Sequence, residues 1–269
     1  MTLSRRDVSE LLTAHGLAPS RALGQNFVVD PNTVRRIARL ARVGPDDRVL
    51  EIGAGLGSLT LALRETGAAV TAVEVDRGIV PVLRQVVEPA GVTVVEADAM
   101  SVDWGTVTGS GPWVLVANLP YNVATPLVVT LLETVPQVIR MLVMVQAEVG
   151  ERLAARVGDE AYGAVSVLVD HWATAEVVGR VPPTVFLPRP KVDSALVSIT
   201  RRPVPLGGGD YGRMKELIRA GFGQRRKMLR RSLAGVVDPA ALIGAGIRPE
   251  ARAEELSVQD WARLATWKG

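Results

Sequence analysis

The sequence predicts an α/β protein with a mostly parallel sheet, followed by a small all-helical domain. Through the first two-thirds of the 269 residues, apolar runs of strand length alternate with segments of helical periodicity. This alternation is typical of parallel strands in a sheet that helices cover on both faces. A proline- and glycine-rich stretch at 203–209 then precedes short helical patterns only, which predicts two domains, 1–202 and 203–269.

The main domain is expected to begin with a helix after Asp30. The Asp30-Pro31 pair supplies an N-cap carboxylate and a proline at the first helical position. Apolar residues then recur on one helical face, at Val34, Ile37, Ala38 and Ala41. The same periodicities predict strands at 49–52, 69–75, 92–96, 113–117 and 139–146, and helices at 59–63, 79–87, 126–134 and 147–155.

The pattern is less regular after Tyr162. A buried helix is expected at 164–172, and strands are expected at 175–181 and 195–200, on either side of a proline-rich segment. A late pair of this kind would lie as antiparallel strands at the edge of the parallel sheet. The helical domain is expected to hold four short helices, at 211–221, 226–233, 239–243 and 258–267.

Composition excludes several kinds of site. The chain has no cysteine and two histidines, which rules out disulfides, thiolate nucleophiles and Cys- or His-rich metal sites, so we expect no metal. No apolar stretch approaches the roughly 20 residues of a membrane span, and the charged N-terminus is unlike a secretory signal. We therefore expect a cytoplasmic protein with no membrane partner.

The net charge of +3 is distributed unevenly along the chain. Residues 1–48 have 8 basic and 5 acidic side chains, residues 49–200 have 9 and 16, and residues 201–269 have 14 and 7. An acidic middle and a basic end are typical of a catalytic core with an appendage that grips a polyanion. Since 27 of the basic residues are arginine, a compositional bias of the genome explains the surplus equally well.

A glycine loop follows the first expected strand. Gly53, Gly55 and Gly57 stand at G-x-G-x-G spacing after Glu51, where the strand would turn into a helix. Glycines let a ligand approach the backbone closely, and the N-terminus of a helix offers unpaired amides. Nucleotide-dependent dehydrogenases have such a loop too, so it does not identify the ligand alone.

Two acidic residues follow the next two expected strands. Glu74 lies 21 residues after Gly53, where a carboxylate can accept hydrogen bonds from both hydroxyls of a ribose. Asp98 follows the third strand, within reach of an adenine amino group on the same ligand. Because the carboxyl ends of parallel strands meet at one edge of the sheet, the loop and both carboxylates converge on one crevice.

The stretch Asn118-Leu119-Pro120-Tyr121 follows the fourth expected strand. The amide oxygen of Asn118 and the carbonyl of Leu119 or Pro120 can accept hydrogen bonds from an exocyclic amine, and the ring of Tyr121 can stack on a base. Such contacts would turn the lone pair of an adenine amino nitrogen out of the ring plane. That nitrogen would then be nucleophilic.

A basic cluster lies in the helical domain. Arg225, Arg226, Lys227, Arg230 and Arg231 put five cations in seven residues. At helical spacing, Arg226 with Arg230 and Lys227 with Arg231 would form adjacent rows for phosphates. A solvated helix face is the alternative interpretation of the same pattern.

Seven segments resemble one family, and they occur in that family's order from about Arg21 to Trp267. They are GQNF at 24–27, EIGAGLG at 51–57, VEVD at 73–76, DAM at 98–100, NLPYN at 118–122, FLPRPKVDS at 186–194 and FGQRRK at 222–227. The chain resembles the small-subunit (16S) ribosomal RNA adenine N6-dimethyltransferases of the KsgA type. It departs from the usual family pattern at Ala54, where proline is common, and at 123–125.

The resemblance implies a Rossmann-like S-adenosylmethionine-dependent methyltransferase sheet with a small helical RNA-binding domain. It implies S-adenosylmethionine as methyl donor and, as acceptors, two adjacent adenines in the 3′-terminal hairpin loop of 16S rRNA. Each adenine would receive two methyl groups, in the small ribosomal subunit or its precursor, as a step of ribosome biogenesis. The oligomeric state stays open, with a monomer expected.

The resemblance also implies roles for individual residues. Those implied in cofactor binding are Gln25, Asn26, Val28, Glu51, Gly53, Gly55, Glu74, Val75, Asp98, Ala99 and Asn118. Those implied in catalysis are Asn118, Leu119, Pro120, Tyr121 and Phe186, with the rings of Tyr121 and Phe186 on either side of the target base. Those implied in RNA binding are Arg21, Arg225, Arg226, Lys227, Arg230 and Arg231.

Three other functions remain open at this point. The first is a related adenine methyltransferase that acts on 23S rRNA and gives macrolide resistance, a family that typically has isoleucine where Leu119 stands. The second is a ribosome-assembly factor whose binding matters more than its methylation. The third is a nucleotide-dependent dehydrogenase, which would leave the segment from Asn118 to Tyr121 unexplained.

Overall fold

The computed structural model describes residues 2–224 and 226–267. Two compact units are present. Residues up to Gly150, with Glu176–Thr200, form the first, and Glu151–Ala175, with the chain from Arg201 onward, form the second. The expected division at residue 202 did not include residues 151–175 in the C-terminal unit.

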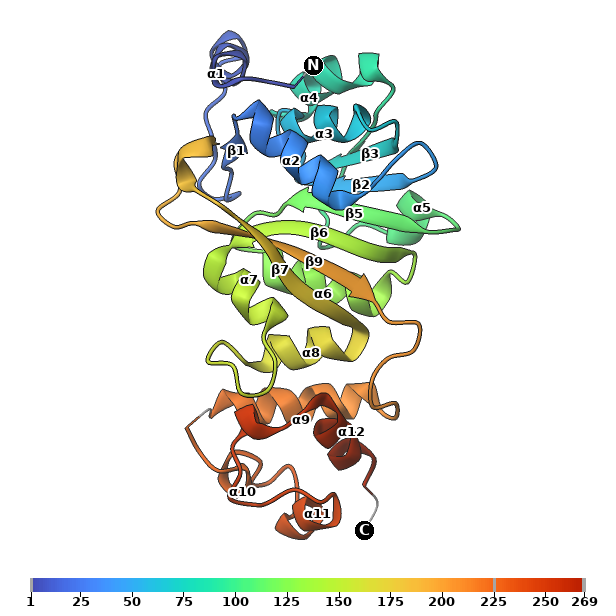
Figure 1. The fold of residues 1–269 in the computed structure, drawn as a ribbon, viewed down its shortest axis with the longest axis vertical. Helices are drawn as coiled ribbons and strands as arrows, with labels where there is room; N and C mark the ends of the chain where they lie inside the picture. The colour runs from blue at the N-terminus through green and yellow to red at the C-terminus, as the bar shows by residue number, and fades with distance from the viewer. Residues whose placement is uncertain (1, 225, 268–269) are drawn as a thin grey trace. The chain divides into compact units, whose positions relative to one another are not determined.

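A seven-stranded sheet organises the first unit, in the order β4-β3-β2-β5-β6-β9-β7 (Figure 1). Strands β2 to β6 pair in parallel, and β9 runs antiparallel to β6. The strands are β2 (Arg48–Ile52), β3 (Ala69–Glu74), β4 (Thr93–Glu96), β5 (Trp113–Asn118), β6 (Val138–Gln146), β7 (Ala173–Val181) and β9 (Ser194–Arg201). The α/β class and the antiparallel late strand are confirmed.

Helices alternate with these strands. They are α1 (Arg5–Ala14), α2 (Pro31–Ala41), α3 (Ser58–Arg64), α4 (Val80–Val87), η1 (Glu88–Ala90), α5 (Trp104–Thr108), α6 (Ala124–Thr134) and α7 (Ala147–Ala154). The expected start of α2 is confirmed, because Asp30 Oδ2 accepts from the amide of Thr33 at 2.9 Å. Helices α1 and α5 were not expected. Helix α5 has five residues, and α1 has a strongly charged sequence.

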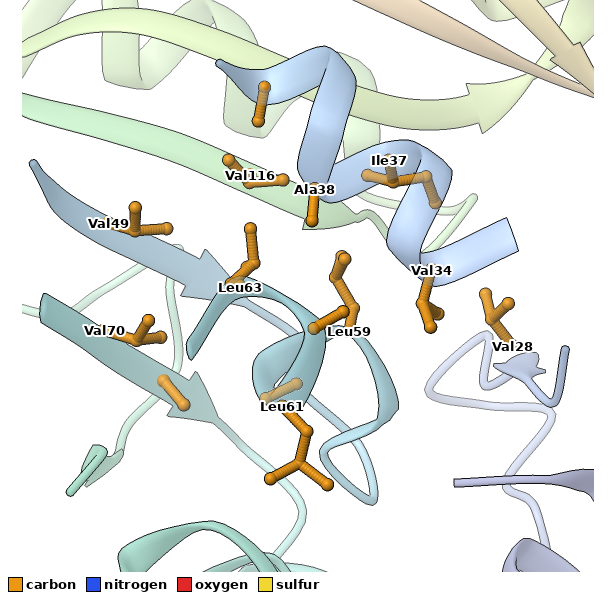
Figure 2. Packing of buried hydrophobic residues seen from close by; sticks show 14 of the residues in the cluster. Val28, Val34, Ile37, Ala38, Val49, Leu59, Leu61, Leu63, Val70 and Val116 are labelled. Atoms are coloured by element: carbon orange, nitrogen blue, oxygen red, sulfur yellow. The ribbon is translucent and has the colours of Figure 1, made fainter. Parts of the chain in front are cut away.

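A hydrophobic cluster between the sheet and α2, α3 and α4 forms the core that positions the site (Figure 2). Val49, Val70 and Val116 point from neighbouring strands toward Ile37 of α2 and Leu63 of α3. Side chains alternate between the two faces of a strand, so residues two or four positions further on lie on the same face. In β2, β3 and β5 those positions at the carboxyl end are Glu51, Glu74 and Asn118.

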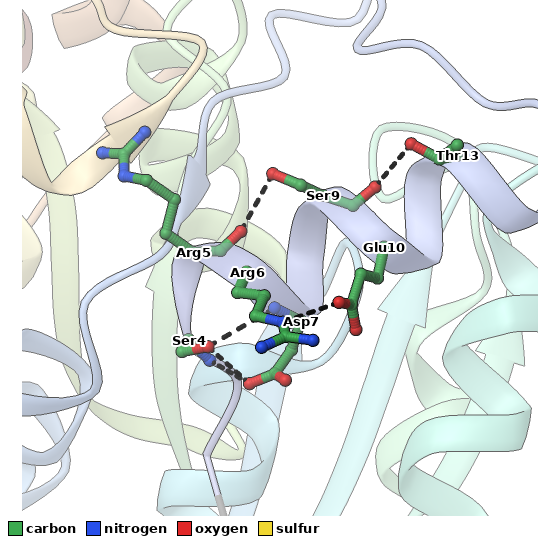
Figure 3. A network of polar contacts seen from close by, with 7 residues as sticks. All are labelled: Ser4, Arg5, Arg6, Asp7, Ser9, Glu10 and Thr13. Carbon is green, nitrogen blue, oxygen red and sulfur yellow. Dashed lines mark hydrogen bonds and ion pairs between the residues drawn. The ribbon is translucent and has the colours of Figure 1, made fainter.

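Helix α1 packs over the start of the main domain. Ser4 caps it through a capping box with Asp7, and Arg6 pairs with Glu10 one turn later (Figure 3). Its buried Val8 and Leu12 belong to a second cluster with Phe27, Val29, Leu56, Ile79 and Val82. Val8, Leu11 and Leu12 stand at helical spacing after Ser4, so the sequence did contain a signal for this helix, which was overlooked beside its charged residues.

A two-stranded ribbon joins distant parts of the first unit. Strand β1 (Phe27–Val28) pairs antiparallel with β8 (Phe186–Leu187), which follows the short helix η2 (Pro183–Val185). Arg5 of α1 donates to the carbonyl oxygens of Thr184 and Phe186, at 2.8 and 3.3 Å. Strands of two residues give no periodic signal, so only the folded chain reveals them.

The second unit is helical. It contains α8 (Ala164–Trp172), α9 (Tyr211–Gly223), α10 (Leu229–Ser232), α11 (Pro239–Gly244), η3 (Ala253–Glu255) and α12 (Val258–Thr266). Helix α8 is buried almost all round, so it requires partners, and it contacts both α9 and α12. Within residues 2–224 and 226–267, no helix is long and apolar enough to cross a bilayer.

Two expectations for the second unit need correction. The helix expected at 226–233 is shorter, because Met228 has extended backbone and α10 begins only at Leu229. The stretch at 203–209 is not a free linker. A Cβ on Gly207 or Gly209 would overlap Ala262 or Thr266 of α12, so this stretch packs against the helix.

Gly57 predicts a difference between two glycine substitutions. A Cβ at Gly57 would lie 2.5 Å from Cγ1 of Val87, whereas Gly16 has open space around it, and both have a positive φ, +90° and +63°. The left-handed backbone costs alanine about 1–2 kcal/mol at either position. Overpacking adds about 1–3 kcal/mol in Gly57→Ala only. Urea titration of both variants measures this, and equal losses of unfolding free energy would contradict the close packing.

Candidate active site

A cavity of about 240 Å³ opens at the carboxyl ends of β2, β3 and β5. The residues that line it come from 23–28, 51–59, 73–75, 97–100 and 118–127. All of the residues implied in cofactor binding lie in its lining, together with Leu119, Pro120 and Tyr121. The convergence expected from three strand ends is therefore present.

The glycine loop passes close to a ring that the sequence did not single out. Gly53 and Gly55 have φ of +73° and +56°, and a Cβ on Gly55 would lie 2.9 Å from the ring of Phe27. Phe27 lines the cavity and is 8% exposed. Its place in the GQNF segment was the only sequence signal. The ring therefore covers the loop and limits position 55 to glycine.

Glu74 is buried and accepts hydrogen bonds from backbone amides at both oxygens. Oε2 accepts from Gly55 at 2.8 Å, and Oε1 accepts from Val75 and Asp76 at 2.9 and 3.0 Å. Burial raises the pKa of Glu74, and the three amide bonds oppose that rise. A carboxylate has about four lone-pair sites, so Oε1 is filled and Oε2 keeps one. A ribose that used both oxygens would have to displace an amide.

Glu51 is the most strongly perturbed carboxyl of the site. It is 2% exposed, and its Oε2 has no hydrogen-bond partner in the described chain. Burial, with the nearby charge of Glu74, raises the pKa of Glu51 to about 8. The nearby hydroxyl of Thr60 on α3 opposes this rise. An unpartnered carboxyl that lines a cavity is suited to a ligand that carries a cation or a donor.

The other expected cofactor residues divide into open and occupied groups. Asp98 is exposed at the cavity, and its Oδ1 accepts from the amide of Met100 at 2.8 Å. Gln25 is already engaged at both ends, since its Nε2 donates to Asp76 at 2.7 Å and its Oε1 accepts from Ser20 at 2.7 Å. Gln25 therefore holds the wall of the cavity, and Asp98 is the one free to bind.

Asn118 is oriented by the backbone opposite it. Its Nδ2 donates to the carbonyl oxygen of Asn26 at 2.9 Å, which turns Oδ1 toward the cavity as an acceptor. The carbonyl of Pro120 already accepts from the amides of Val123 and Ala124, at 3.1 and 3.0 Å. The two carbonyls left open by the sequence are thus distinguished. Within the described residues no hydrogen bond reaches the carbonyl of Leu119, whereas the carbonyl of Pro120 is already used at the start of α6.

The two expected aromatic rings differ in their surroundings. Tyr121 lines the cavity, and its hydroxyl lies 2.8 Å from Oγ of Ser194, with either atom able to donate. Burial raises the pKa of the Tyr121 hydroxyl. Phe186 is 0% exposed, pairs with Val28 and belongs to the hydrophobic core. In the free chain the ring of Phe186 packs into the core, so its expected place beside the target base stays a prediction.

The expected RNA-binding residues lie in both units. Arg21 is exposed in the first, and Arg226, Lys227, Arg230 and Arg231 are exposed in the second, while Arg225 lies outside the described residues. Arg226 and Lys227 precede α10, so the two helical rows of cations do not form. Arg230 also faces Glu250, with 3.9 Å between Nη1 and Oε1.

The charge of the cavity indicates the kind of ligand it fits. Glu51, Glu74 and Asp98 line it, and the lining residues of the described chain include no Arg, Lys or His. This fits a cationic sulfonium donor better than the pyrophosphate of a dinucleotide. The hydrogen-bond acceptors of Asn118 and Leu119 also line the cavity. They are suited to holding an amine that accepts a methyl group, and a hydride transfer would not need them.

Sheet and cavity together define a class, the Rossmann-like methyltransferases that use S-adenosylmethionine. A model of the ribosomal RNA adenine dimethylase family matches residues 18–269. The chain belongs to this family and is an enzyme of it.

Relatives and solved structures agree with this assignment. The "Ribosomal RNA small subunit methyltransferase A" of Streptomyces coelicolor is 47% identical over 99% of this chain and 96% of its own length. That of Kineococcus radiotolerans is 48% identical over 98% and 90%. The crystal structure of 23S rRNA methyltransferase ErmE covers 89% of this chain and 98% of its own, at a TM-score of 0.68 and 28% identity. A dimethyladenosine transferase from Plasmodium falciparum, with a TM-score of 0.73, 24% identity, and coverage of 87% and 94%, supports the fold alone.

Glu51 predicts a pH dependence of stability. Its folded pKa of about 8 lies above its ordinary value of 4.5, so the unfolded chain ionises first. The free energy of unfolding should fall as pH rises from about 4.5 to about 8, and stay level above that range. We expect Glu51→Gln to remove this loss and to be more stable than wild type at pH 8.5, but not at pH 4.

Thermal denaturation across this pH range measures the effect, and Asp103→Asn is the matched control. The hydroxyl of Thr106 and the amide of Gly105 hold the pKa of Asp103 below its ordinary value. Its contribution is present at high pH and is lost as pH falls, so this variant should be less stable than wild type at pH 8.5. A Glu51→Gln protein that also loses stability at pH 8.5 would contradict the burial argument.

Proposed function

We propose that this enzyme dimethylates N6 of two adjacent adenines in the 3′-terminal hairpin loop of 16S rRNA, in the small ribosomal subunit or its precursor. The observation that carries the proposal is the pair of acceptors, Oδ1 of Asn118 and the carbonyl of Leu119, on two residues that line an acidic cavity. The printed names of relatives that are 47 and 48% identical support small-subunit RNA as the acceptor. The proposed place of action is the cytoplasm, as a monomer.

In the proposed reaction, the chain orients the acceptor nitrogen. Oδ1 of Asn118 and the carbonyl of Leu119 accept the two N–H bonds of the adenine amine, which directs its lone pair out of the ring plane. When bound, S-adenosylmethionine supplies an electrophilic methyl group on a good leaving group. The proton lost by the methylated amine would leave to solvent. Orientation and electrostatics suffice, so no titrating base is needed.

Proposed cofactor contacts follow the open acceptors of the cavity. Asp98 would accept from the adenine amine of the donor, and Oε2 of Glu74 would accept from one ribose hydroxyl. Glu51 would lie against the positively charged methionine part. Gly53 would let that part approach the backbone. The other lining residues would form the walls of the cavity around the donor.

For the acceptor base, Tyr121 is the proposed stacking ring. An adenine must leave its own stack to enter, at a cost of a few kcal/mol that is smallest in a loop. Phe186 could serve as a second ring only after β8 moved away from β1, because its side chain is buried in the free enzyme. Exposed Arg21, Arg226, Lys227, Arg230 and Arg231, with Arg225 from the sequence, would bind phosphates.

A second acceptor is favoured by one observation. The 23S rRNA methyltransferase ErmE matches 89% of this chain at a TM-score of 0.68. Its 28% identity is well below the 47% of the Streptomyces relative, which supports the small subunit as the first choice. A role in ribosome assembly through binding alone would use the same surfaces.

The first test separates binding from transfer. Asn118→Ala removes the acceptor Oδ1 and the bond to Asn26, and we expect methyl transfer to be abolished. Cofactor affinity should stay within about tenfold of wild type, since one lost hydrogen bond is worth about 0.5–1.5 kcal/mol. Calorimetry with S-adenosylmethionine and a radiolabel transfer assay measure the two effects. Normal transfer by this variant would sink the proposed acceptor pair.

The second test identifies the RNA. Purified small and large ribosomal subunits that lack the modification are incubated with enzyme and labelled donor, and the RNA is digested for mass spectrometry. We expect two adjacent N6,N6-dimethyladenines in small-subunit RNA and none in large-subunit RNA. Label in 23S rRNA alone would favour the ErmE-like acceptor. The Asn118→Ala protein is the control for background transfer.

A further inference from the structure

One segment between two walls of the cavity has no part in the function proposed above. It consists of residues 188–193, which we call the strap. On its N-terminal side it continues from β8, whose Leu187 pairs with the cavity-lining Phe27. On its C-terminal side it leads into Ser194, which is hydrogen-bonded to the hydroxyl of Tyr121 at 2.8 Å.

Both ends of the strap are fixed by backbone hydrogen bonds. The amide of Val29 donates to the carbonyl of Val185 at 2.8 Å, and the amide of Ala147 donates to that of Asp193 at 2.9 Å. Ser194 is 0% exposed and pairs in register with Gln146 of β6. The sheet therefore holds the partner of Tyr121 in place.

The strap presents two cations close to these fixed points. Arg189 and Lys191 are exposed, and in the described chain neither has an ion pair or a side-chain hydrogen bond. Since each residue spans at most ~3.6 Å, the Cα of Arg189 lies within ~7 Å of that of Leu187, and the Cα of Lys191 within ~11 Å of that of Ser194. Pro188 and Pro190 restrict the backbone around both cations.

The charge of the cavity explains why cations are needed there. Glu74 and Asp98 suit a cationic donor, but their carboxylates repel the phosphates of an approaching RNA strand. Exposed cations on the strap, whose neighbours Leu187 and Ser194 contact the cavity-lining Phe27 and Tyr121, would offset this repulsion and attract the RNA strand. Phosphate contacts give affinity and register, while the orientation of the base decides the rate of transfer.

We propose that the strap binds phosphates that flank the nucleotide entering the cavity, through Arg189 and Lys191, and that Ser194 positions Tyr121 against its base. The inference rests on the proposed function. Because Ser194 directly follows the strap, the residues that would bind the RNA phosphates and the residue that holds the stacking ring are neighbours in the chain. Arg189 and Lys191 thus govern binding, and Ser194 is a positioning residue that governs the chemical step.

The binding half is tested by salt dependence. Each phosphate contact with single-stranded RNA contributes about 0.7 to the slope of log K against log salt, so Arg189→Ala/Lys191→Ala should reduce the slope for small ribosomal subunits by about 1.4. Arg35→Ala/Arg84→Ala is the matched control. It removes the same charge from arginines that pair with Glu65 and Glu88, and it should keep the wild-type slope. An unchanged slope in the strap variant, or an equal change in the control, would overturn the phosphate contacts.

The positioning half is tested by separating kcat from KM. Ser194→Ala should lower kcat about 3- to 10-fold, the effect of one hydrogen bond, with KM for the subunit and affinity for S-adenosylmethionine unchanged. Ser194→Thr should restore kcat. Tyr121→Phe should match Ser194→Ala, and the double variant should lose no more. A double variant whose loss of kcat equals the product of the two single losses would refute the role of the Ser194–Tyr121 hydrogen bond. A Ser194→Ala protein with normal kcat would refute it too.

The two proposals fail separately. A wild-type enzyme that binds small subunits but does not methylate them would refute the proposed function, while the salt slopes, which depend on binding alone, would still judge the strap. If the wild type methylates normally and the Arg189→Ala/Lys191→Ala variant has the same salt slope as wild type, only the proposed role of the strap is refuted.

Discussion

The site depends on the parallel register of β2, β3 and β5. Register pairs Glu51 with Ala72 and Val49 with Val70 and Val114, so the apolar residues of three strands share one face with the polar residues at their ends. The helices α2, α3 and α4 cover the apolar part. Beyond it the same face presents Glu51, Glu74 and Asn118 to a cavity. A register shift of one residue in any of these strands would move its apolar and polar side chains to the opposite face of the sheet.

Hydrogen bonds within the protein orient the polar groups of that cavity and leave some of their acceptors open. Three amides engage Glu74, two amides engage the carbonyl of Pro120, and the carbonyl of Asn26 engages Nδ2 of Asn118. Acceptors that stay open in the described chain include Oδ1 of Asn118, the carbonyl of Leu119 and Asp98, together with the buried carboxyl of Glu51. An oriented amide and a carbonyl can position an amine without titrating, which agrees with a site free of histidine and cysteine.

Charge is distributed according to the two ligands. Carboxylates line the cavity, where a cationic donor would lie, and exposed arginines and lysines lie on the strap and on the segment before α10. An acidic site alone would repel a polyanion, and a basic site alone would repel the donor. The proposed division of labour follows from this separation.

The sequence by itself determined the alternation of strands and helices, the start of α2 at Asp30, and the convergence of the glycine loop, Glu74, Asp98 and Asn118, because each depends on local periodicity and on the geometry of parallel strands. It could not predict contacts between segments far apart in the chain. Only the tertiary structure decided that Phe27 covers Gly55 and that Phe186 is buried beside Val28. It also decided that the carbonyl of Pro120 accepts from the first amides of α6 and that Ser194 is hydrogen-bonded to Tyr121. Such pairings depend on which surfaces meet after folding, and short strands or single side chains leave no repeating pattern that would announce them.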